Sequence, residues 1–143
     1  MSSTEPRGPE IGRRSDLLYR QIREIHIQDG RVTSAAFKPA TSDQGLPSVN
    51  ASWKTTAEVA MARATALGLV PVAVYAVSCD ECYDLGLKAW EDPEDGPPPD
   101  PSHSVIDFRQ HGRGAQDSKG KKLREKALER GCQHPIGLKL TAA

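Results

Sequence analysis

An arginine, a serine and a later carboxylate stand in this chain in an order that suits the binding of a dinucleotide. Arg20 can pair with phosphate oxygens, and the hydroxyl of Ser48 can hold a ribose or orient the arginine. A carboxylate can then activate an acceptor or stabilise an oxocarbenium ion. Such an order of residue types is common in proteins, so it permits this chemistry without specifying it. The acids that could fill the last role are Glu81, Asp84 and Asp107.

Small hydroxyl residues, turn residues and fixed charges gather in the stretches 30–39 and 45–49. Such a composition is typical of a binding site more than of a core. Basic side chains there would hold phosphate or another anion, and the hydroxyl groups would orient it. We therefore expect a ligand-binding surface made of Arg20, Arg31, Thr33, Ser34, Lys38 and Ser48, with His103 and Asp107 nearby.

Four residues suggest metal or thiol chemistry. Cys79 and Cys82 form a CxxC pair, and Cys132 with His134 would supply two more ligands of the kind that zinc takes. A cysteine pair at a helix start also suits redox chemistry, because the helix N-terminus lowers the pKa of a thiol. The interpretation that we favour is that both cysteines pack as small apolar side chains. On that interpretation the chain needs neither a metal nor a cofactor.

The overall composition narrows the class of partner. The 143 residues carry 19 basic and 19 acidic side chains, so no net charge draws the molecule to nucleic acid or to an anionic membrane. No apolar run approaches the roughly 18 residues that a membrane-spanning helix requires. The odd number of cysteines, three, argues against a disulfide framework. With its polar N-terminus, the chain is expected to be cytoplasmic, with a protein or a small anionic ligand as its partner.

The elements that must position these side chains can be predicted from local patterns. Residues 1–14 contain little to bury and predict a disordered tail, followed by a single domain over residues 15–140. The domain opens with a strand that ends near Ile22, before a turn or short helix. Asp29–Gly30 marks a further turn, and residues 31–37 are expected to be extended.

The clearest helix signal covers residues 56–67, where Thr55 and Glu58 can form a capping box. Its apolar face is rich in alanine, so the helix must pack closely against a flat surface such as a sheet. The β-branched run 70–77 follows directly and predicts a central strand buried on both faces.

The second half of the domain has weaker signals. Ser78 begins a short helix by the same capping pattern, and the acidic, Pro-rich residues 91–101 predict an exposed loop. Residues 104–108 predict a strand, residues 118–130 a charged helix and residues 136–140 an edge strand. The fold expected from these elements is α+β: a single small domain with a central mixed sheet, one strong helix packed on it, and long loops.

The core of the chain contains the motifs YRQI (19–22), DGRVTSxAFKP (29–39), GLPSV (45–49) and HSVIDF (103–108). Through these motifs it resembles a small, functionally uncharacterised bacterial family. A weaker likeness connects the chain to compact ADP-ribosyltransferase-type folds. It depends on Arg20 in a strand and Ser48 after a loop, followed by a helix and a buried strand, and the chain lacks a clear Gln/Glu-x-Glu pair.

Three functions remain as interpretations of these patterns. We favour an accessory or interaction protein with a polar site for an anionic or phosphate-bearing ligand. The alternative that the resemblance implies is an NAD- or nucleotide-using enzyme of ADP-ribosyltransferase type, with Arg20 and Ser48 at the cofactor. The third is a zinc-stabilised binding module.

Overall fold

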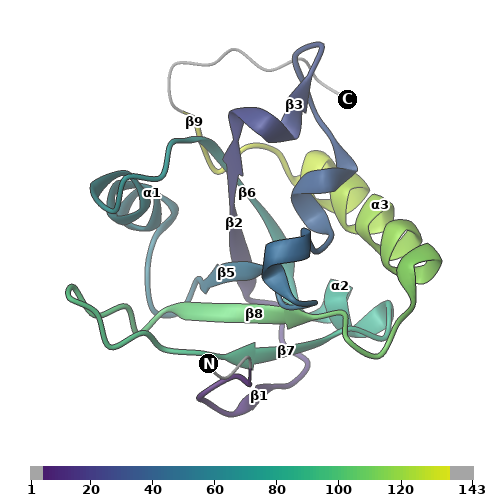
Figure 1. Ribbon diagram of the computed structural model, residues 1–143, viewed down its shortest axis with the longest axis horizontal. Helices are drawn as coiled ribbons and strands as arrows, with labels where there is room; N and C mark the ends of the chain where they lie inside the picture. The colour runs from purple at the N-terminus through teal and green to yellow at the C-terminus, as the bar shows by residue number, and fades with distance from the viewer. Residues whose placement is uncertain (1–4, 136–143) are drawn as a thin grey trace.

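The computed structural model describes residues 5–135, and its centre is one twisted sheet with helices on both faces (Figure 1). The strands of this sheet are β1 (Glu10–Ile11), β2 (Leu17–Arg23), β5 (Ser48–Ala51), β6 (Pro71–Ser78), β7 (Lys88–Glu91), β8 (His103–Asp107) and β9 (His134–Pro135). Their order within residues 5–135 is β1-β7-β8-β5-β2-β6-β9. A separate hairpin pairs β3 (Ile27–Gln28) with β4 (Arg31–Val32).

The predicted α+β class is confirmed, but the pairing differs in one respect. The sequence predicted a mixed sheet, whereas every strand pair in the described residues is antiparallel. The sheet is also twisted, since β7 and β8 run across the view of Figure 1 while β2 and β6 run from its top toward its bottom. This twist separates the edges of β2 and β5, which matters for the site described below.

The helices lie on opposite faces of the sheet (Figure 1). One face carries α1 (Ala57–Ala66), and the other carries α2 (Cys79–Asp84) and α3 (Arg113–Arg130). The 3₁₀ turns η1 (Glu24–His26), η2 (Ser34–Phe37) and η3 (Thr41–Asp43) lie between β2 and β5 in the chain. Among residues 5–135, no helix has both the length and the apolar character needed to cross a bilayer.

The pairing of β2 with β6 forms the centre of the core. The register places Leu18 opposite Val77 and Ile22 opposite Ala73, and all four residues are fully buried. These side chains face α3, while their neighbours along β6, such as Val74, face α1. Strand β6 is therefore covered on both faces, as its continuous apolar run predicts.

The predicted helix at 56–67 is confirmed as α1, although its cap is one residue later than expected. The Thr56 hydroxyl accepts a hydrogen bond from the backbone N–H of Val59 at 3.1 Å, whereas the hydroxyl of Thr55 is directed at the carbonyl of Thr56. The face turned to the sheet is made of small residues and one methionine: Ala57, Ala60, Met61 and Ala64.

The cap of α2 is the one that the sequence predicts. The Ser78 hydroxyl accepts from the N–H of Glu81 at 3.0 Å, and the Glu81 carboxylate accepts from the N–H of Ser78 at 2.8 Å. Helix α3 begins at Arg113, five residues before its predicted start. Gly120 lets α3 approach η2 closely, because a Cβ there would lie 2.9 Å from the Cβ of Lys38.

The segment that precedes β2 corrects a prediction. The sequence predicted a disordered tail over 1–14, but β1 pairs with β7 and Ile11 is buried. The N–H of Gly8 donates to the carbonyl of Glu91 at 2.9 Å, which extends this contact along the chain. The only large apolar residue in β1 is Ile11. Pairing with β7 therefore holds this strand in place, and its local sequence does not predict that pairing. Residues 1–4 lie outside the described residues.

Four other local predictions concern a turn, an extended segment, a loop and an edge strand. The turn at Asp29–Gly30 is confirmed, with φ of 54° and 76° that suit glycine at the second position. The extended segment 31–37 is wrong beyond Thr33, because Ser34–Phe37 forms η2. Residues 95–99 of the predicted exposed loop are exposed, whereas Asp100 is 5 % exposed and forms a bridge with Glu94. The predicted edge strand at 136–140 lies outside the described residues.

Candidate functional site

A cavity of about 330 Å³ opens where β2 and β5 separate. These strands pair only at Leu18 with Ala51 and at Tyr19 with Asn50. Beyond that point the cavity lies between the second half of β2, the start of β5, helix α1 and the segment 94–103. A volume of this size is at the lower end of the range for small-molecule sites.

Arg20 fills the split between the two strands. Its Nε donates to the carbonyl of Ala36 at 2.7 Å, and its Nη1 donates to the carbonyl of Ser48 at 2.8 Å. The guanidinium thus takes the place of a strand partner for Ser48. Among residues 5–135, no carboxylate lies within ion-pair distance of it. Burial lowers the pKa of Arg20, the charge of Asp43 raises it and the charge of Arg23 lowers it further. The result is a half-buried positive charge without a direct counter-ion.

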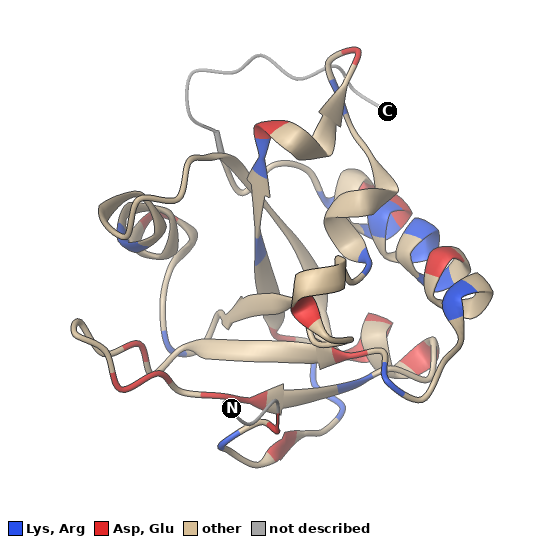
Figure 2. Cartoon of the chain, in the orientation of Figure 1, with Lys and Arg blue, Asp and Glu red and all other residues tan. Residues whose placement is uncertain are grey.

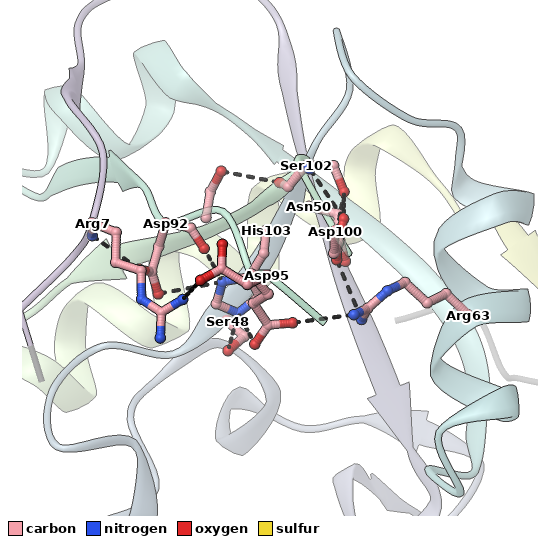
Figure 3. Close-up of polar contacts among 11 residues, drawn as sticks. Arg7, Ser48, Asn50, Arg63, Asp92, Asp95, Asp100, Ser102 and His103 are labelled. Carbon is pink, nitrogen blue, oxygen red and sulfur yellow. Dashed lines mark hydrogen bonds and ion pairs between the residues drawn. The ribbon is translucent and has the colours of Figure 1, made fainter. Parts of the chain in front are cut away.

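Ser48 and His103, which line this cavity, form a chain of polar contacts with Asp92 beside it (Figure 3). The Oγ of Ser48 lies 3.0 Å from Nε2 of His103. On the other side of the ring, Nδ1 lies 2.7 Å from the backbone carbonyl oxygen of Asp92 and 3.3 Å from its carboxylate. The sheet register explains how Ser48 and His103 meet, because Asn50 lies opposite His103 and Ser48 is two residues along the same face of β5.

A second polar cluster forms the wall nearer α1 (Figure 3). The carboxylate of Asp100 accepts from the N–H and hydroxyl of Ser102 at 3.0 and 2.6 Å, and from Asn50 at 3.1 Å. Arg63 reaches this cluster from α1, with its guanidinium 3.4 Å from Asp100 and 3.5 Å from Glu94. Arg63 of α1 therefore holds the acidic segment after β7 against the cavity.

Some polar atoms of the cavity have no partner. Among the side-chain nitrogens and oxygens buried within residues 5–135, only the amide oxygen and nitrogen of Gln21 and the Nε of Arg63 lack a hydrogen bond. Both residues line this cavity. A buried polar group without a partner costs about 1–3 kcal/mol. A ligand or a bound water could therefore satisfy polar groups in this cavity.

The charges of the cavity are divided between its two ends. Arg20 and Arg23 lie toward β2 with a single acid, Asp43, whereas Glu94 and Asp100 lie toward the 94–103 segment with Arg63. Figure 2 shows the same separation, with acidic residues along the loop that follows β7. One end thus has an excess of positive charge and the other an excess of negative charge. A ligand that carries an anion and several hydroxyl or amino groups matches this distribution.

His26 borders the positive end and is held in its neutral form. The side chain is buried, and its Nδ1 accepts from the N–H of Arg23 at 3.1 Å. Burial, with smaller contributions from Arg20 and Arg23, lowers the pKa of His26 to about 4. The positive charge at this end of the cavity therefore comes from the arginines alone at neutral pH.

Three of the residues predicted to bind a ligand lie together in this cavity: Arg20, Ser48 and His103. Another three, Arg31, Thr33 and Ser34, lie at a separate, open depression beside α3, together with Lys121 and Arg124. The hydroxyl of Thr33 is used there in a structural contact, since it donates to the carbonyl of His26 at 3.1 Å. The predicted surface is thus divided between two places.

The last two predicted residues are engaged elsewhere. Lys38 forms an ion pair with Asp117 of α3, with a distance of 3.1 Å from Nζ to the carboxylate. Asp107 is fully buried and accepts from Trp90 and from Arg109, away from the cavity. Asp107 was predicted to lie near the ligand, but its partners are two residues along the chain and in the neighbouring strand.

The carboxylates predicted to complete a dinucleotide site do not reach it. Glu81 is paired with Arg130 at 2.8 Å, and Asp84 lies 2.5 Å from Arg13. The acids that do line the cavity are Asp43, Glu94 and Asp100, and Asp92 contacts His103 beside it. Sequence reasoning missed Asp92, Glu94 and Asp100 because residues 91–101 were predicted to be a solvated loop.

The cysteines do not assemble into a site in the part of the chain that the structure describes. Cys79 and Cys82 are buried at the end of β6, and burial raises the pKa of both thiols, that of Cys79 to about 11. Cys132 is exposed, and His134 pairs with Val74 near the middle of β6. No group of three or more possible metal ligands occurs within residues 5–135. Packing as apolar side chains is what the structure shows for the CxxC pair.

Comparison of the chain with protein-family models, with curated proteins and with solved structures finds no match in any of the three.

Proposed function

We propose that the protein binds a small phosphate-bearing or otherwise anionic molecule in the cavity between β2, β5 and α1. The observation that carries this proposal is Arg20, whose guanidinium contacts two backbone carbonyls and no carboxylate in residues 5–135. A half-buried charge of this kind is costly unless an opposite charge approaches it. A phosphate oxygen can supply that charge and accept from the nitrogens that the two carbonyls leave available.

The other walls of the cavity support a ligand larger than a bare anion. Carboxylates such as Glu94 and Asp100 accept hydrogen bonds from sugar hydroxyls or amino groups. The Gln21 amide is shielded from solvent, so it would meet a ligand after turning toward the cavity. A nucleotide matches this separation of charges, with its phosphate at Arg20 and its sugar toward the acidic end.

The test is binding of pyrophosphate and of ADP, measured by titration calorimetry on the wild type and two variants. Arg20→Gln keeps a donor for the Ser48 carbonyl and removes the charge, so we expect about 10- to 100-fold weaker binding. Arg31→Gln is the matched control, because Arg31 lies at the separate depression beside α3. It should bind as the wild type does.

Folding of the variant can be checked independently. Arg20→Lys retains a positive charge and should recover part of the lost affinity, which a purely structural defect would not explain. Circular dichroism and thermal unfolding report whether Arg20→Gln is folded. Binding that is unchanged in Arg20→Gln, or lost equally in Arg31→Gln, would contradict the proposal.

A second candidate is an NAD- or nucleotide-using enzyme of ADP-ribosyltransferase type. The observation in its favour is that Arg20 and Ser48 line one cavity although 28 positions separate them, with Nη1 of Arg20 donating to the backbone carbonyl of Ser48 at 2.8 Å. Glu94 is the acid in that cavity which could steady a developing positive charge on a ribose. Release of nicotinamide from NAD, followed by mass spectrometry, tests this candidate. An absence of turnover with the folded wild-type protein removes it.

A further inference from the structure

The contacts of His103 determine which of its nitrogens carries the proton. A backbone carbonyl oxygen can only accept a hydrogen bond, and the carbonyl of Asp92 lies 2.7 Å from Nδ1. Nδ1 must therefore be the donor, and in the neutral ring this leaves Nε2 with a lone pair. That lone pair faces the Oγ of Ser48 at 3.0 Å, so the serine hydroxyl donates to the histidine.

This arrangement is the one that a serine nucleophile requires. A neutral imidazole can take the hydroxyl proton as the oxygen attacks, and a carboxylate near its other nitrogen stabilises the imidazolium that forms. The carboxylate of Asp92 is 3.3 Å from Nδ1 and serves that purpose. Asp92 is itself held by the N–H of Arg7, which donates to its other oxygen at 3.0 Å (Figure 3).

The exposure of Ser48 distinguishes it from a serine that only forms buried structural hydrogen bonds. Ser48 is exposed at the cavity, while the side chain of His103 is only 13 % exposed. Both residues lie on paired strands, β5 and β8, so their backbones are fixed relative to each other. The hydroxyl is thus open to a ligand, and the base behind it is held in place.

We propose that Ser48 is the nucleophile of an esterase activity, with His103 as the general base and Asp92 as a positioning residue. As Oγ bonds to the acyl carbon of an ester, its proton passes to Nε2 of His103. The bond from that carbon to the alcohol oxygen then breaks, and Nε2 returns the proton to the departing alcohol. Water next attacks the acyl-serine, its proton passes through Nε2 to Oγ, and the free acid leaves.

The class of ester follows from the proposed function and rests on it. Arg20 donates to the backbone carbonyl of Ser48 at 2.8 Å, which places a positive charge beside the residue that carries the nucleophile. The substrate expected is a small carboxylic ester that also carries an anionic group. The volume of about 330 Å³ excludes long acyl chains.

The first experiment is covalent labelling of the whole protein with a fluorophosphonate, followed by mass spectrometry of its peptides. Oγ displaces fluoride from phosphorus, so we expect the adduct on Ser48 alone and none in Ser48→Ala. His103→Asn should slow labelling by about 10²- to 10⁴-fold, the usual contribution of a general base. Ser34→Ala is the matched control, since Ser34 lies at the separate depression, and should label at the wild-type rate.

The second experiment compares hydrolysis of p-nitrophenyl acetate with that of mono-p-nitrophenyl succinate. The succinate ester carries a carboxylate, so its kcat/KM should exceed that of the acetate in the wild type and not in Arg20→Gln. Asp92→Asn should lower kcat and leave KM unchanged. Its effect should be smaller than that of His103→Asn, because the backbone carbonyl still fixes the tautomer.

The outcomes separate this inference from the proposed function. Absence of labelling at Ser48, or labelling that is as fast in His103→Asn, overturns the esterase activity even if ADP binding persists. Labelling that depends on His103, without any preference for the anionic ester, supports the nucleophile and overturns the assigned substrate class.

Discussion

The contribution of buried hydrogen bonds to the stability of this fold can be tested at Asp107. Its carboxylate is fully buried and accepts hydrogen bonds from Arg109 and Trp90. It accepts from the N–H and Nε of Arg109 at 2.9 and 3.0 Å, from Nη2 of Arg109 at 2.9 Å and from Nε1 of Trp90 at 3.0 Å. Asp107→Asn keeps the shape of the side chain and removes its charge. The amide offers one oxygen, and its NH₂ group must face donors that have lost their acceptor.

The expected cost can be worked from these contacts. Loss of one partner from a buried ion pair costs about 3–5 kcal/mol. The lower end applies here, because the Arg109 side chain is 26 % exposed and retains a contact with Glu5 at 2.7 Å. We therefore expect Asp107→Asn to reduce the free energy of unfolding by about 3 kcal/mol. Urea unfolding at pH 7, followed by tryptophan fluorescence and circular dichroism, measures this quantity.

A matched control is Asp84→Asn. This carboxylate also pairs with an arginine, Arg13, but its side chain is 63 % exposed. Exposed pairs contribute about 0–1 kcal/mol, so this variant should differ little from the wild type. If Asp107→Asn were as stable as Asp84→Asn, the reasoning from burial and hydrogen bonding would be refuted.

The same carboxylate should make the stability depend on acid pH. Burial alone raises the pKa of Asp107, but hydrogen bonds from Arg109 and Trp90 outweigh it and hold the pKa below its usual value. A carboxyl whose pKa is lower in the folded state stabilises the protein above its unfolded pKa, near 3.9, and loses that contribution as the pH falls through the folded value. Asp107→Asn should therefore lose less stability than the wild type between pH 5 and pH 3.

Three further outcomes are expected. Because His26 has a folded pKa of about 4 and an unfolded pKa near 6.5, the free energy of unfolding should fall as the pH drops from 6.5 to 4, by up to about 3 kcal/mol. His26→Gln, measured by urea unfolding over this range, should lack that slope. Thr56→Ala should cost about 1 kcal/mol through loss of the α1 cap, while Thr55→Ala should cost under about 0.5 kcal/mol; the opposite order in thermal unfolding would assign the cap to the wrong residue. Of the three cysteines, Cys132 should react rapidly with Ellman's reagent in the native protein and the two buried thiols only after unfolding; rapid reaction of all three would contradict their burial.

The parts of the fold that the sequence predicts well are those with a dense local signal. The strand 70–77 has an unbroken apolar run, and Ser78 with Glu81 forms a cap that involves four consecutive residues. Strands β1 and β7 escaped prediction because they contain two and four residues and owe their structure to pairing with distant segments. The predicted mixed sheet was wrong for a related reason, since strand direction depends on how the connecting segments cross the sheet.

The residues of the candidate site could be predicted only in part, because their contacts also depend on pairing between distant segments. Arg20 and Ser48 were singled out by residue type, but their contact depends on the point at which β2 and β5 stop pairing. Asp92 was missed because an acidic, Pro-rich segment has the composition of a solvated loop. Its contact with Nδ1 of His103 becomes visible only in the folded structure. Asp107 was assigned to the ligand because its burial by Trp90 and Arg109 cannot be seen in the order of residues.

The pairing of β1 with β7 has a practical consequence for handling the protein. At this end of the sheet β1 occupies the hydrogen-bonding edge of β7 with only two residues. A chain shortened to begin at Gly12 would leave β7 as an open edge, and unpaired backbone groups of that kind recruit strands from other molecules. Shortened preparations should therefore self-associate with rising concentration, and affinity tags are better joined to the far end of the chain.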